Sequence, residues 1–560
     1  MRQHGAPAGD DGVQRAERCS EHLAVAGTDP ALRDSRRVVR DPDQLPRARA
    51  DLRRLRAPPR ARNASPDAAV AGDPAPRRSR RRRRRRSALP APGRPRPGHP
   101  GARGRGGPRV LRGDLLRTPA VRRRRAGRAA RQARGPRPGC FDHGLTVDVL
   151  LVAHGYPPDR RGGTELLTAG LADELARAGH GVRVLAAAGV AGNPQVRDTT
   201  VESIPVRLLE RPVPADYQLA RADAGAQRQL ELLIEEERPD VVHVQHTLFL
   251  GPEIIGTASR RAATVVSLHD FWAQCPLVHT GPRDHHPVRG DWWGAACFMH
   301  YELRHPLQLL GEVARGSLGA TVKAHLERPR RFRRELGTAD ALVVPSAFLR
   351  DSFVRFGVPE SRIDVIPNPV AVTPPSTERA SNSVPVRFGY VGALAPHKGV
   401  HVLLDAFAAA GDGAELHVFG AAEDPAYAER LRQRATDGVV FHGSFDGARR
   451  DEVYASFDVL VVPSLVHETF SLVTLEAQTA GKPVIASRVG ALPELVRDRV
   501  NGRLVRPGDG RGLAAAIGSL GDPEAVHRLR PQAAAGVLDL PAYAERLTQL
   551  YERVRAKRNP

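Results

Sequence analysis

From residue 146 onward the sequence predicts an α/β protein with two doubly wound sheets, each built from parallel strands with helices on both faces. Short β-branched apolar runs alternate with segments that carry leucines at helical spacing. These runs lack alternation between apolar and polar residues, which is typical of parallel strands covered on both faces. A Pro/Ser/Thr-rich stretch at residues 372–385 separates two such series and indicates a linker.

The first half begins with one strand–helix–strand unit. The run VDVLLVAHG at residues 147–155 is a short β-branched strand. The next segment places Leu167, Leu171 and Leu175 on one helical face and ends at a glycine, after which GVRVLAAAG forms another strand. Similar strands are expected at residues 240–246, 264–270 and 339–346. We assign these elements to an N-terminal domain that spans residues 146–375.

The second half repeats the alternation of strand and helix. Strands are expected at residues 386–392, 415–420, 439–444, 458–464 and 483–487. We assign residues 384–535 to a C-terminal domain. In the last segment, residues 536–560, an amphipathic helix is expected because four apolar residues form one stripe, and we expect this helix to pack back on the N-terminal half: Leu547, Leu550, Tyr551 and Val554.

Residues 1–145 differ sharply from the rest of the chain. They contain 38 arginines, no lysine and 13 acidic residues, a net charge of +25, whereas the remaining residues have a net charge of −2. The segment is rich in Arg, Pro, Gly and Ala and has no sustained hydrophobic periodicity, so we predict that it is disordered. It could bind nucleic acid through runs such as Arg80–Arg86, or it could be upstream sequence translated from a start site assigned too early. The second interpretation is preferred, and nucleic acid is therefore not expected as a partner.

Cysteine content and hydropathy indicate the cellular compartment in which the protein is expected. Four cysteines in 560 residues, without a CxxC pair, are typical of a reducing environment. No apolar run approaches the roughly 20 residues that span a bilayer. We therefore expect a cytoplasmic protein. The arginine-rich stretch at residues 325–337 is either a solvated helical face or a peripheral contact with anionic lipid on the inner face of the membrane, and the sequence leaves both open.

The stretch HETFSLVTLEAQTAGKP carries two glutamates, Glu468 and Glu476, around an expected helix start. Thr469 or Ser471 can cap this helix, which would leave the amides of Phe470, Ser471 and Leu472 as free donors at its positive end. Such an end binds anions. Eight residues at about 1.5 Å each place the glutamates roughly 12 Å apart. This layout suits a ligand with a diphosphate in the middle and hydroxyls at both ends, as in a nucleotide sugar.

These motifs resemble those of retaining glycosyltransferases of family 4, which have the GT-B fold of two Rossmann-like domains. The stretch ETFSLVTLEAQTAGKPVIAS is similar to the E-x7-E signature of that family, and ALPELVRDRVNGRLVRPGD is similar to its next motif. By this resemblance Glu468 contacts the transferred sugar and Glu476 the ribose, Glu494 belongs to a helix near the donor, and VNGRLV forms a hairpin. The resemblance implies a hexosyltransferase that uses a nucleotide-sugar donor, a glycan, lipid-linked or small-molecule acceptor, and no metal or other cofactor.

The stretch YVGALAPHKGV, which follows the first strand of the second half, resembles the phosphate loop of the family. The resemblance assigns donor binding to Gly392, His397 and Lys398, and Lys398 would neutralise the leaving diphosphate. The family often has an arginine after the first glycine, whereas this chain has Ala393. Another group, such as Arg488 or His397, would then have to supply the second positive charge.

The first half contributes two further motifs to the expected site. In PPDRRGGTE, Gly162, Gly163 and Glu165 match the GGxE motif of the family, where a backbone without side chains can approach a phosphate or the acceptor. In SLHDFW, His269 ends a strand where the family places a histidine against the transferred sugar, and Asp270 would orient His269 or bind the acceptor. His269, Lys398 and Glu468 are the expected catalytic residues.

There are four alternatives to this interpretation. The cysteines and histidines between Cys275 and His300 could bind zinc, but their spacing contains no tight ligand pair, so no metal is expected. A glycoside hydrolase would need two carboxylates roughly 5 to 10 Å apart and no diphosphate loop. An epimerase of the same fold would convert the donor without an acceptor. A nucleic-acid-binding protein would depend on residues 1–145.

Overall fold

A computed structural model describes the chain over nine segments: residues 146–160, 162–190, 193–214, 217–276, 318–371, 385–411, 413–422, 424–531 and 537–558. Three expectations therefore lie outside the described residues. They are the disorder of residues 1–145, most of the linker at residues 372–385, and the cysteine–histidine set apart from Cys275, which is buried.

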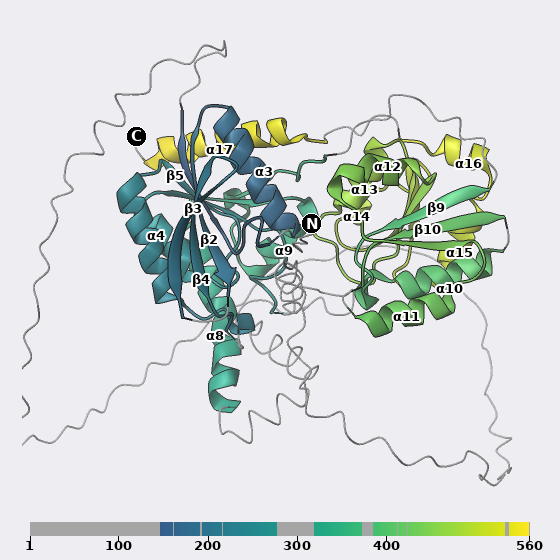
Figure 1. Ribbon diagram of the computed structural model, residues 1–560, viewed down its shortest axis with the longest axis horizontal. Helices are drawn as coiled ribbons and strands as arrows, with labels where there is room; N and C mark the ends of the chain where they lie inside the picture. Colours follow the sequence, from purple (N-terminus) through teal and green to yellow (C-terminus); the bar gives the residue numbers. More distant parts are fainter. Residues whose placement is uncertain are drawn as a thin grey trace, which may run out of the picture. The chain divides into compact units, whose positions relative to one another are not determined.

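The first half folds around an eight-stranded sheet in the order β3-β4-β2-β1-β5-β6-β7-β8, counted over the described residues (Figure 1). All neighbouring strands are parallel except β3 and β4. The strands are β1 (Asp148–Ala153), β2 (Gly181–Gly189), β3 (Gln195–Val201), β4 (Ile204–Arg211), β5 (Val241–Val244), β6 (Ala263–Ser267), β7 (Ala341–Val344) and β8 (Ile363–Val365). The antiparallel β3–β4 pair and the short β8 were not expected from the sequence.

The second half folds around a six-stranded sheet, again counted over the described residues, in the order β11-β10-β9-β12-β13-β14. Its strands are all parallel: β9 (Val386–Val391), β10 (Ala414–Phe419), β11 (Val439–Gly443), β12 (Val459–Val462), β13 (Val484–Ser487) and β14 (Gly502–Val505). The hairpin expected for VNGRLV does not form as a pair of strands in the described residues, because residues 499–501 form a turn and β14 pairs in parallel with β13.

Helices cover both faces of each sheet, as the expected GT-B architecture requires. In the first half they are α3 (Gly163–Arg177), α4 (Ala224–Glu237), α5 (Glu253–Ser259), α8 (Leu318–Leu336) and α9 (Ala347–Phe356). In the second half they are α10 (Val400–Ala410), α11 (Pro425–Arg434), α12 (Arg450–Ala455), α13 (Leu472–Thr479), α14 (Leu492–Leu495), α15 (Gly510–Gly518) and α16 (Pro523–Arg528). The last described helix is α17 (Leu540–Arg558).

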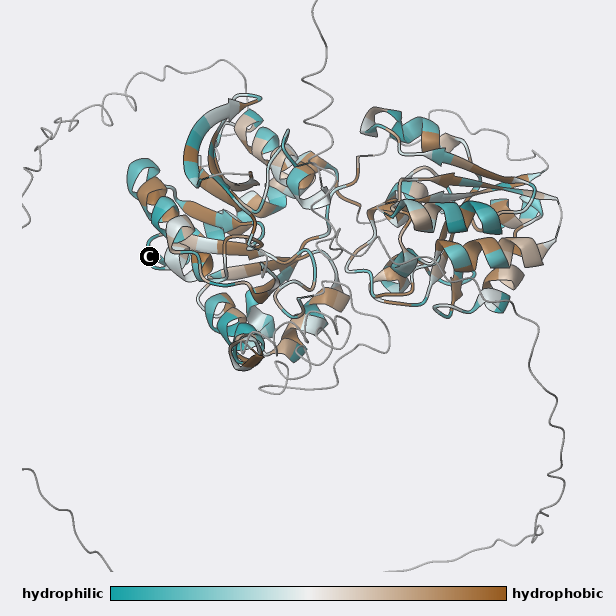
Figure 2. Ribbon diagram, turned by 60° about the horizontal axis from the view of Figure 1, so that its bottom comes forward, coloured by the Kyte–Doolittle hydropathy of each residue, from teal (hydrophilic) through white to brown (hydrophobic). Residues whose placement is uncertain are grey.

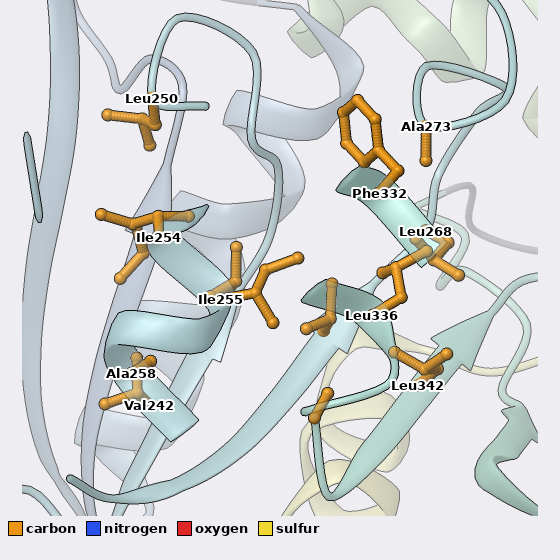
Figure 3. Close-up of a cluster of buried hydrophobic side chains, with 14 of the residues drawn as sticks. Val242, Leu250, Ile254, Ile255, Ala258, Leu268, Ala273, Phe332, Leu336 and Leu342 are labelled. Atoms are coloured by element: carbon orange, nitrogen blue, oxygen red, sulfur yellow. The ribbon is translucent and has the colours of Figure 1, made fainter. Parts of the chain in front are cut away.

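Successive residues of a central strand enter different cores, which explains why the strands are apolar on both faces. In β1, Leu150 and Val152 belong to one buried cluster, and Val149 and Leu151 belong to the other. The residues of β12 divide in the same way between the two clusters of the second half. Figure 2 shows the result as brown strands inside helices that carry teal residues. Figure 3 shows one cluster, in which α5 and α8 pack over the sheet.

The C-terminal helix α17, yellow in Figure 1, packs on the first half against α3 and β6. The predicted stripe of Leu547, Leu550, Tyr551 and Val554 is buried in the same cluster as Val149. The chain therefore returns to its first domain after completing the second.

The arginine-rich helix α8 is largely a packing element. Arg328 is 1% exposed, donates to the carbonyls of Trp272 and Ala273, and stacks 4.7 Å from the ring centres of Trp272 and Phe332. Arg331 pairs with both oxygens of Glu253 at 2.7 and 2.9 Å. Neither a solvated face nor a lipid contact describes these two residues, so that part of the expectation was wrong. Among the described residues, no helix is long and apolar enough to cross a membrane.

Candidate active site

Sheet topology brings two loops of the second half together. The strands β9 and β12 are hydrogen-bonded neighbours, and the connections from them lead to opposite sides of the sheet, so their carboxyl ends flank a switch point where ligands bind in such folds. Gly399, at φ +75°, follows the first loop and faces the carbonyl of Pro463 so closely that a side chain would collide with it. The amide of Leu465 donates to the carbonyl of His397 at 2.9 Å.

The two loops join Lys398 to Glu468. Lys398 Nζ lies 2.9 Å from Glu468 Oε1, and the hydroxyl of the buried Ser464 donates to the same oxygen at 2.5 Å. The side chains of Lys398 and Glu468 are 31% and 17% exposed, so both remain accessible to a ligand. The structure thus places together a lysine and a glutamate that lie 70 residues apart in the sequence.

The backbone of Glu468 is held by the loop before α14. The amide of Ala491 donates to the carbonyl of Glu468 at 2.8 Å, and the amide of Gly490 donates to His467 Nδ1 at 3.1 Å. Gly490 has φ +61°, and a Cβ at this residue would lie 2.5 Å from the amide nitrogen of Glu468. Only glycine allows this approach.

We expect the substitution Gly490→Ala to displace Glu468 and to destabilise the protein by about 1–3 kcal/mol, because the new methyl group overlaps backbone atoms. Thermal unfolding and transfer assays would measure both effects. Gly481→Ala is the matched control, because Gly481 has a similar φ of +71° but no atom within 4 Å of its added Cβ. Equal effects of the two substitutions would show that backbone strain alone matters and that Glu468 is not displaced.

Helix α13 begins at Leu472, directly after Glu468 and its neighbours. The expected side-chain cap is absent: the hydroxyl of Ser471 bonds Thr474 Oγ1 at 2.8 Å, and Thr469 Oγ1 donates to the carbonyl of His269 at 2.9 Å. Within the described residues, the amides of Phe470, Ser471 and Leu472 donate to no carbonyl or side chain. These three donors at the positive end of α13 therefore remain available to an anion.

Glu476 lies one turn into α13 and is buried, with 8% exposure. Its Oε2 accepts from the hydroxyl of Tyr454 at 2.6 Å, and its Oε1 lies 3.3 Å from Arg450 Nε. Burial and the adjacent carboxylate raise the pKa of Tyr454, so the phenol stays protonated and donates. Sequence reasoning missed Arg450 and Tyr454. Their spacing of four residues on a helix that leads into β12 was the available signal.

A single pocket of about 760 Å³ collects most of the expected site. Its lining includes nine of the residues expected from the sequence: Gly163, His269, Gly392, Lys398, Glu468, Phe470, Ser471, Leu472 and Glu476. Arg450 and Ala393 also line it, whereas Gly162, Glu165, Asp270 and His397 do not. Arg488 is exposed and lies outside the lining, so the lining contains Arg450 but neither of the two residues expected to replace the missing arginine.

His269 reaches the pocket from the carboxyl end of β6. Its Nε2 lies 3.1 Å from the Oε1 of Gln245, a buried residue that follows β5 and that sequence reasoning missed. Burial, together with the neighbouring ring of His246, lowers the pKa of His269 to about 4, so its imidazole is neutral near pH 7. The hydrogen bond from Thr469 to its carbonyl connects His269 to the loop that carries Glu468.

Three expected residues have partners outside the pocket lining. Asp270 accepts from Trp272 N at 2.8 Å and lies 3.3 Å from His246 Nε2. Within the described residues it forms no hydrogen bond with the side chain of His269, so the expected orientation of His269 by Asp270 is not seen; its expected contact with the acceptor stays a prediction. Burial opposes its ionisation, but these partners lower the pKa of Asp270 to about 2. Glu165 is buried and lies 3.2 Å from His154 Nε2. Glu494 accepts from the amides of Ala347 and Phe348 at the start of α9.

Sequence models of two families match the chain. The model described as "Glycosyltransferase Family 4" matches residues 161–373, and the model described as "Glycosyl transferases group 1" matches residues 385–522. Both halves of the chain are therefore similar to glycosyltransferases, each to a different family model. Of the described helices and strands, β1, α16 and α17 lie outside these two ranges, and the nine expected residues of the pocket lie inside them.

Curated relatives of this chain include a glycogen synthase of Mycobacterium tuberculosis, 33% identical over 206 residues, and a D-inositol 3-phosphate glycosyltransferase of Acidothermus cellulolyticus, 30% identical over 250 residues. The matches cover 35% and 40% of this chain and 49% and 54% of the two relatives. The chain therefore spans about half the length of the curated relatives it matches.

Solved structures share the fold of this chain. The Anabaena protein HepE in complex with UDP and glucose is 19% identical, covers 73% of this chain and 100% of its own, and has a TM-score of 0.50. Sucrose-phosphate synthase from Thermosynechococcus elongatus is 20% identical, with the same coverage and a TM-score of 0.50. These comparisons confirm the predicted GT-B architecture.

Proposed function

We propose that this glycosyltransferase moves a hexose from a nucleotide-sugar donor to a glycan, lipid-linked or small-molecule acceptor, with retention of anomeric configuration and without a metal. One observation carries the proposal: Lys398, Glu468, the free amides that begin α13, and the buried Glu476 line the same pocket. We place the reaction in the cytoplasm, as the low cysteine content predicts.

In this proposal the donor diphosphate binds between the amides of residues 470–472 and Lys398. In the ligand-free protein each carboxylate already has a cation, since Lys398 pairs with Glu468 and Arg450 with Glu476. A diphosphate would attract both cations, and the hydroxyls of the hexose and the ribose would then donate to Glu468 and Glu476 respectively. Donor binding would thus replace both ion pairs. Each cation would contact the diphosphate, and each carboxylate would accept a hydrogen bond from a sugar hydroxyl.

The chemistry we propose is a same-face displacement, in which the acceptor hydroxyl attacks from the side of the leaving diphosphate and its proton passes to an oxygen of that diphosphate. Lys398 would stabilise the charge that develops on the diphosphate as the glycosidic bond breaks. Glu468 would face the positive charge that develops on the sugar ring. Neutral His269 would accept a hydrogen bond from a sugar hydroxyl and so orient the ring. This route needs no covalent protein nucleophile.

Arg450 is expected to supply the second positive charge that Ala393 cannot supply. We expect Arg450→Ala to raise the KM for the donor by about 10- to 100-fold, because a hydrogen bond to a charged group contributes about 1.5–3 kcal/mol. Steady-state kinetics with varied donor would measure the change. Arg449→Ala is the matched control, because Arg449 is exposed, pairs with Glu452 at 2.9 Å and does not line the pocket. A donor KM unaffected by Arg450→Ala would remove Arg450 from the donor site.

The proposed function can be tested by screening the full chain against UDP-, GDP- and ADP-sugars in thermal unfolding. A donor that binds only the native state raises the melting temperature. At a free donor concentration of 100 times its Kd, the native state is stabilised by about 2.7 kcal/mol. The stabilising donor is then offered with candidate acceptors, and the anomeric configuration of the product is read by NMR with and without EDTA. Transfer with retention in EDTA is expected. Inversion, dependence on a metal, or conversion of the donor without an acceptor would each contradict the proposal.

A further inference from the structure

A chain of buried hydrogen bonds leads from α17 to the pocket through the first half of the molecule. The hydroxyl of Tyr551 lies 2.6 Å from His243 Nδ1, and His243 Nε2 lies 2.9 Å from Ser267 Oγ. The side-chain nitrogen of Gln245 lies 3.2 and 3.3 Å from the two ring nitrogens of His243, and its side-chain oxygen lies 3.1 Å from His269 Nε2. His243 and Gln245 are fully buried.

Gln245 is held rigidly at the end of β5. Its backbone amide donates to the carbonyl of Val152 at 2.7 Å, which extends the pairing of β5 with β1 by one hydrogen bond. Its amide nitrogen lies nearly equidistant from the two ring nitrogens of His243, and its amide oxygen faces His269. Rotation of this buried side chain would break its hydrogen bond with His269, which water does not replace.

This contact decides the tautomer of His269. An amide oxygen only accepts hydrogen bonds, so Nε2 of a neutral His269 must carry the hydrogen. The other nitrogen, Nδ1, then carries a lone pair. Within the described residues Nδ1 forms no hydrogen bond, and His269 lines the pocket. We propose that Gln245 is a positioning residue that fixes His269 in the Nε2–H tautomer, so that Nδ1 accepts a hydroxyl of the bound sugar.

The fixed tautomer is independent of the proposed function, whereas the role of Nδ1 rests on it. The titratable groups around His269 are His246 and Asp270, His154 and Glu165, and His243. Burial is the largest effect and keeps the ring neutral; the rings of His246 and His154 also lower the pKa of His269, whereas the carboxylates of Asp270 and Glu165 raise it. A neutral ring has two tautomers, and only the contact with Gln245 distinguishes them here.

The tautomer can be measured by 15N NMR on the full chain labelled at histidine, without any ligand. The chain contains 21 histidines, so the His269 signals are identified by their loss in His269→Phe. In the wild type at pH 7 we expect a protonated Nε2 and an unprotonated Nδ1. In Gln245→Leu, which removes the acceptor, we expect both tautomers. A wild-type Nδ1–H signal, or an unchanged single tautomer in Gln245→Leu, would overturn the proposal.

Two further variants separate positioning from packing. Gln245→Glu keeps an acceptor but adds a negative charge, which raises the pKa of His269. Between the old and new pKa the ring would carry a hydrogen on Nδ1, so transfer should fall at acidic pH and recover as pH rises. Gln245→Leu should instead lower kcat by about 3- to 10-fold at every pH. Identical pH profiles for the two variants would contradict the proposed role.

Tyr551→Phe serves as the control at the far end of the chain. It removes the hydroxyl beside His243 but leaves Gln245 and its contact with His269 in place. The tautomer of His269 should therefore be unchanged. A mixed tautomer in Tyr551→Phe, with a wild-type melting temperature, would show that Gln245 alone does not fix the ring. If no donor is transferred by the wild type but the tautomer is as expected, only the proposed function fails.

Discussion

Replacing Lys398 by alanine is expected to lower kcat by about 10²- to 10³-fold, because the diphosphate gains negative charge as it leaves and Lys398 is placed to stabilise that charge. The effect should appear in kcat more than in donor KM, since the free amides of residues 470–472 still bind the ground-state phosphates. Steady-state kinetics with the donor found by thermal screening would measure it.

The substitution Lys398→Ala is expected to leave the stability of the fold nearly unchanged. The side chain of Lys398 is about a third exposed, so its ion pair with Glu468 is screened by solvent and should contribute little to stability. The melting temperature of Lys398→Ala should stay close to that of the wild type. Lys398→Arg keeps the positive charge and should recover part of the rate. A loss smaller than 3-fold in Lys398→Ala would remove Lys398 from the reaction.

Glu468→Ala is expected to abolish measurable transfer, with a loss of at least about 10²-fold in kcat. The carboxylate would accept hydroxyls of the hexose and face the positive charge that develops on its ring, and alanine can do neither. Transfer would be followed with the same donor and acceptor as for Lys398.

Glu468→Gln distinguishes charge from shape at this residue. Glutamine keeps the size of the side chain and one acceptor oxygen but removes the charge that pairs with Lys398 at 2.9 Å. We expect an intermediate loss of about 10-fold or more, because hydrogen bonds to charged groups are roughly twice as strong as neutral ones. Wild-type rates in Glu468→Ala, with an unchanged fold, would show that the transferred sugar binds elsewhere.

Much of the fold followed from the sequence because the parallel strands are apolar on both faces. The continuous run at residues 459–462 enters two different cores, and only a strand covered on both sides needs that pattern. The antiparallel β3 escaped prediction for the opposite reason. This strand, QVRDTTV, is largely exposed at the edge of the sheet, so its sequence does not need the run of apolar residues by which the other strands were predicted.

Site residues that lie together in one short stretch of sequence could be predicted. Site residues that are distant in the sequence and meet only in the fold could not. Glu468 and Glu476 were found in one segment, and both line the pocket. Arg450 and Tyr454 contact Glu476 from 26 and 22 residues away, and Gln245 reaches His269 across 24 residues. Thr469 and Ser471 were expected to cap α13, but each has a tertiary or local partner that competes with the cap.

The most direct test of the donor site is a crystal structure of the full chain bound to the nucleotide sugar that stabilises it. The account predicts that the diphosphate lies within hydrogen-bonding distance of the amides of residues 470–472 and of Lys398, with the ribose on Glu476 and the hexose on Glu468. A donor bound elsewhere, or a diphosphate whose oxygens contact neither the start of α13 nor Lys398, would contradict it.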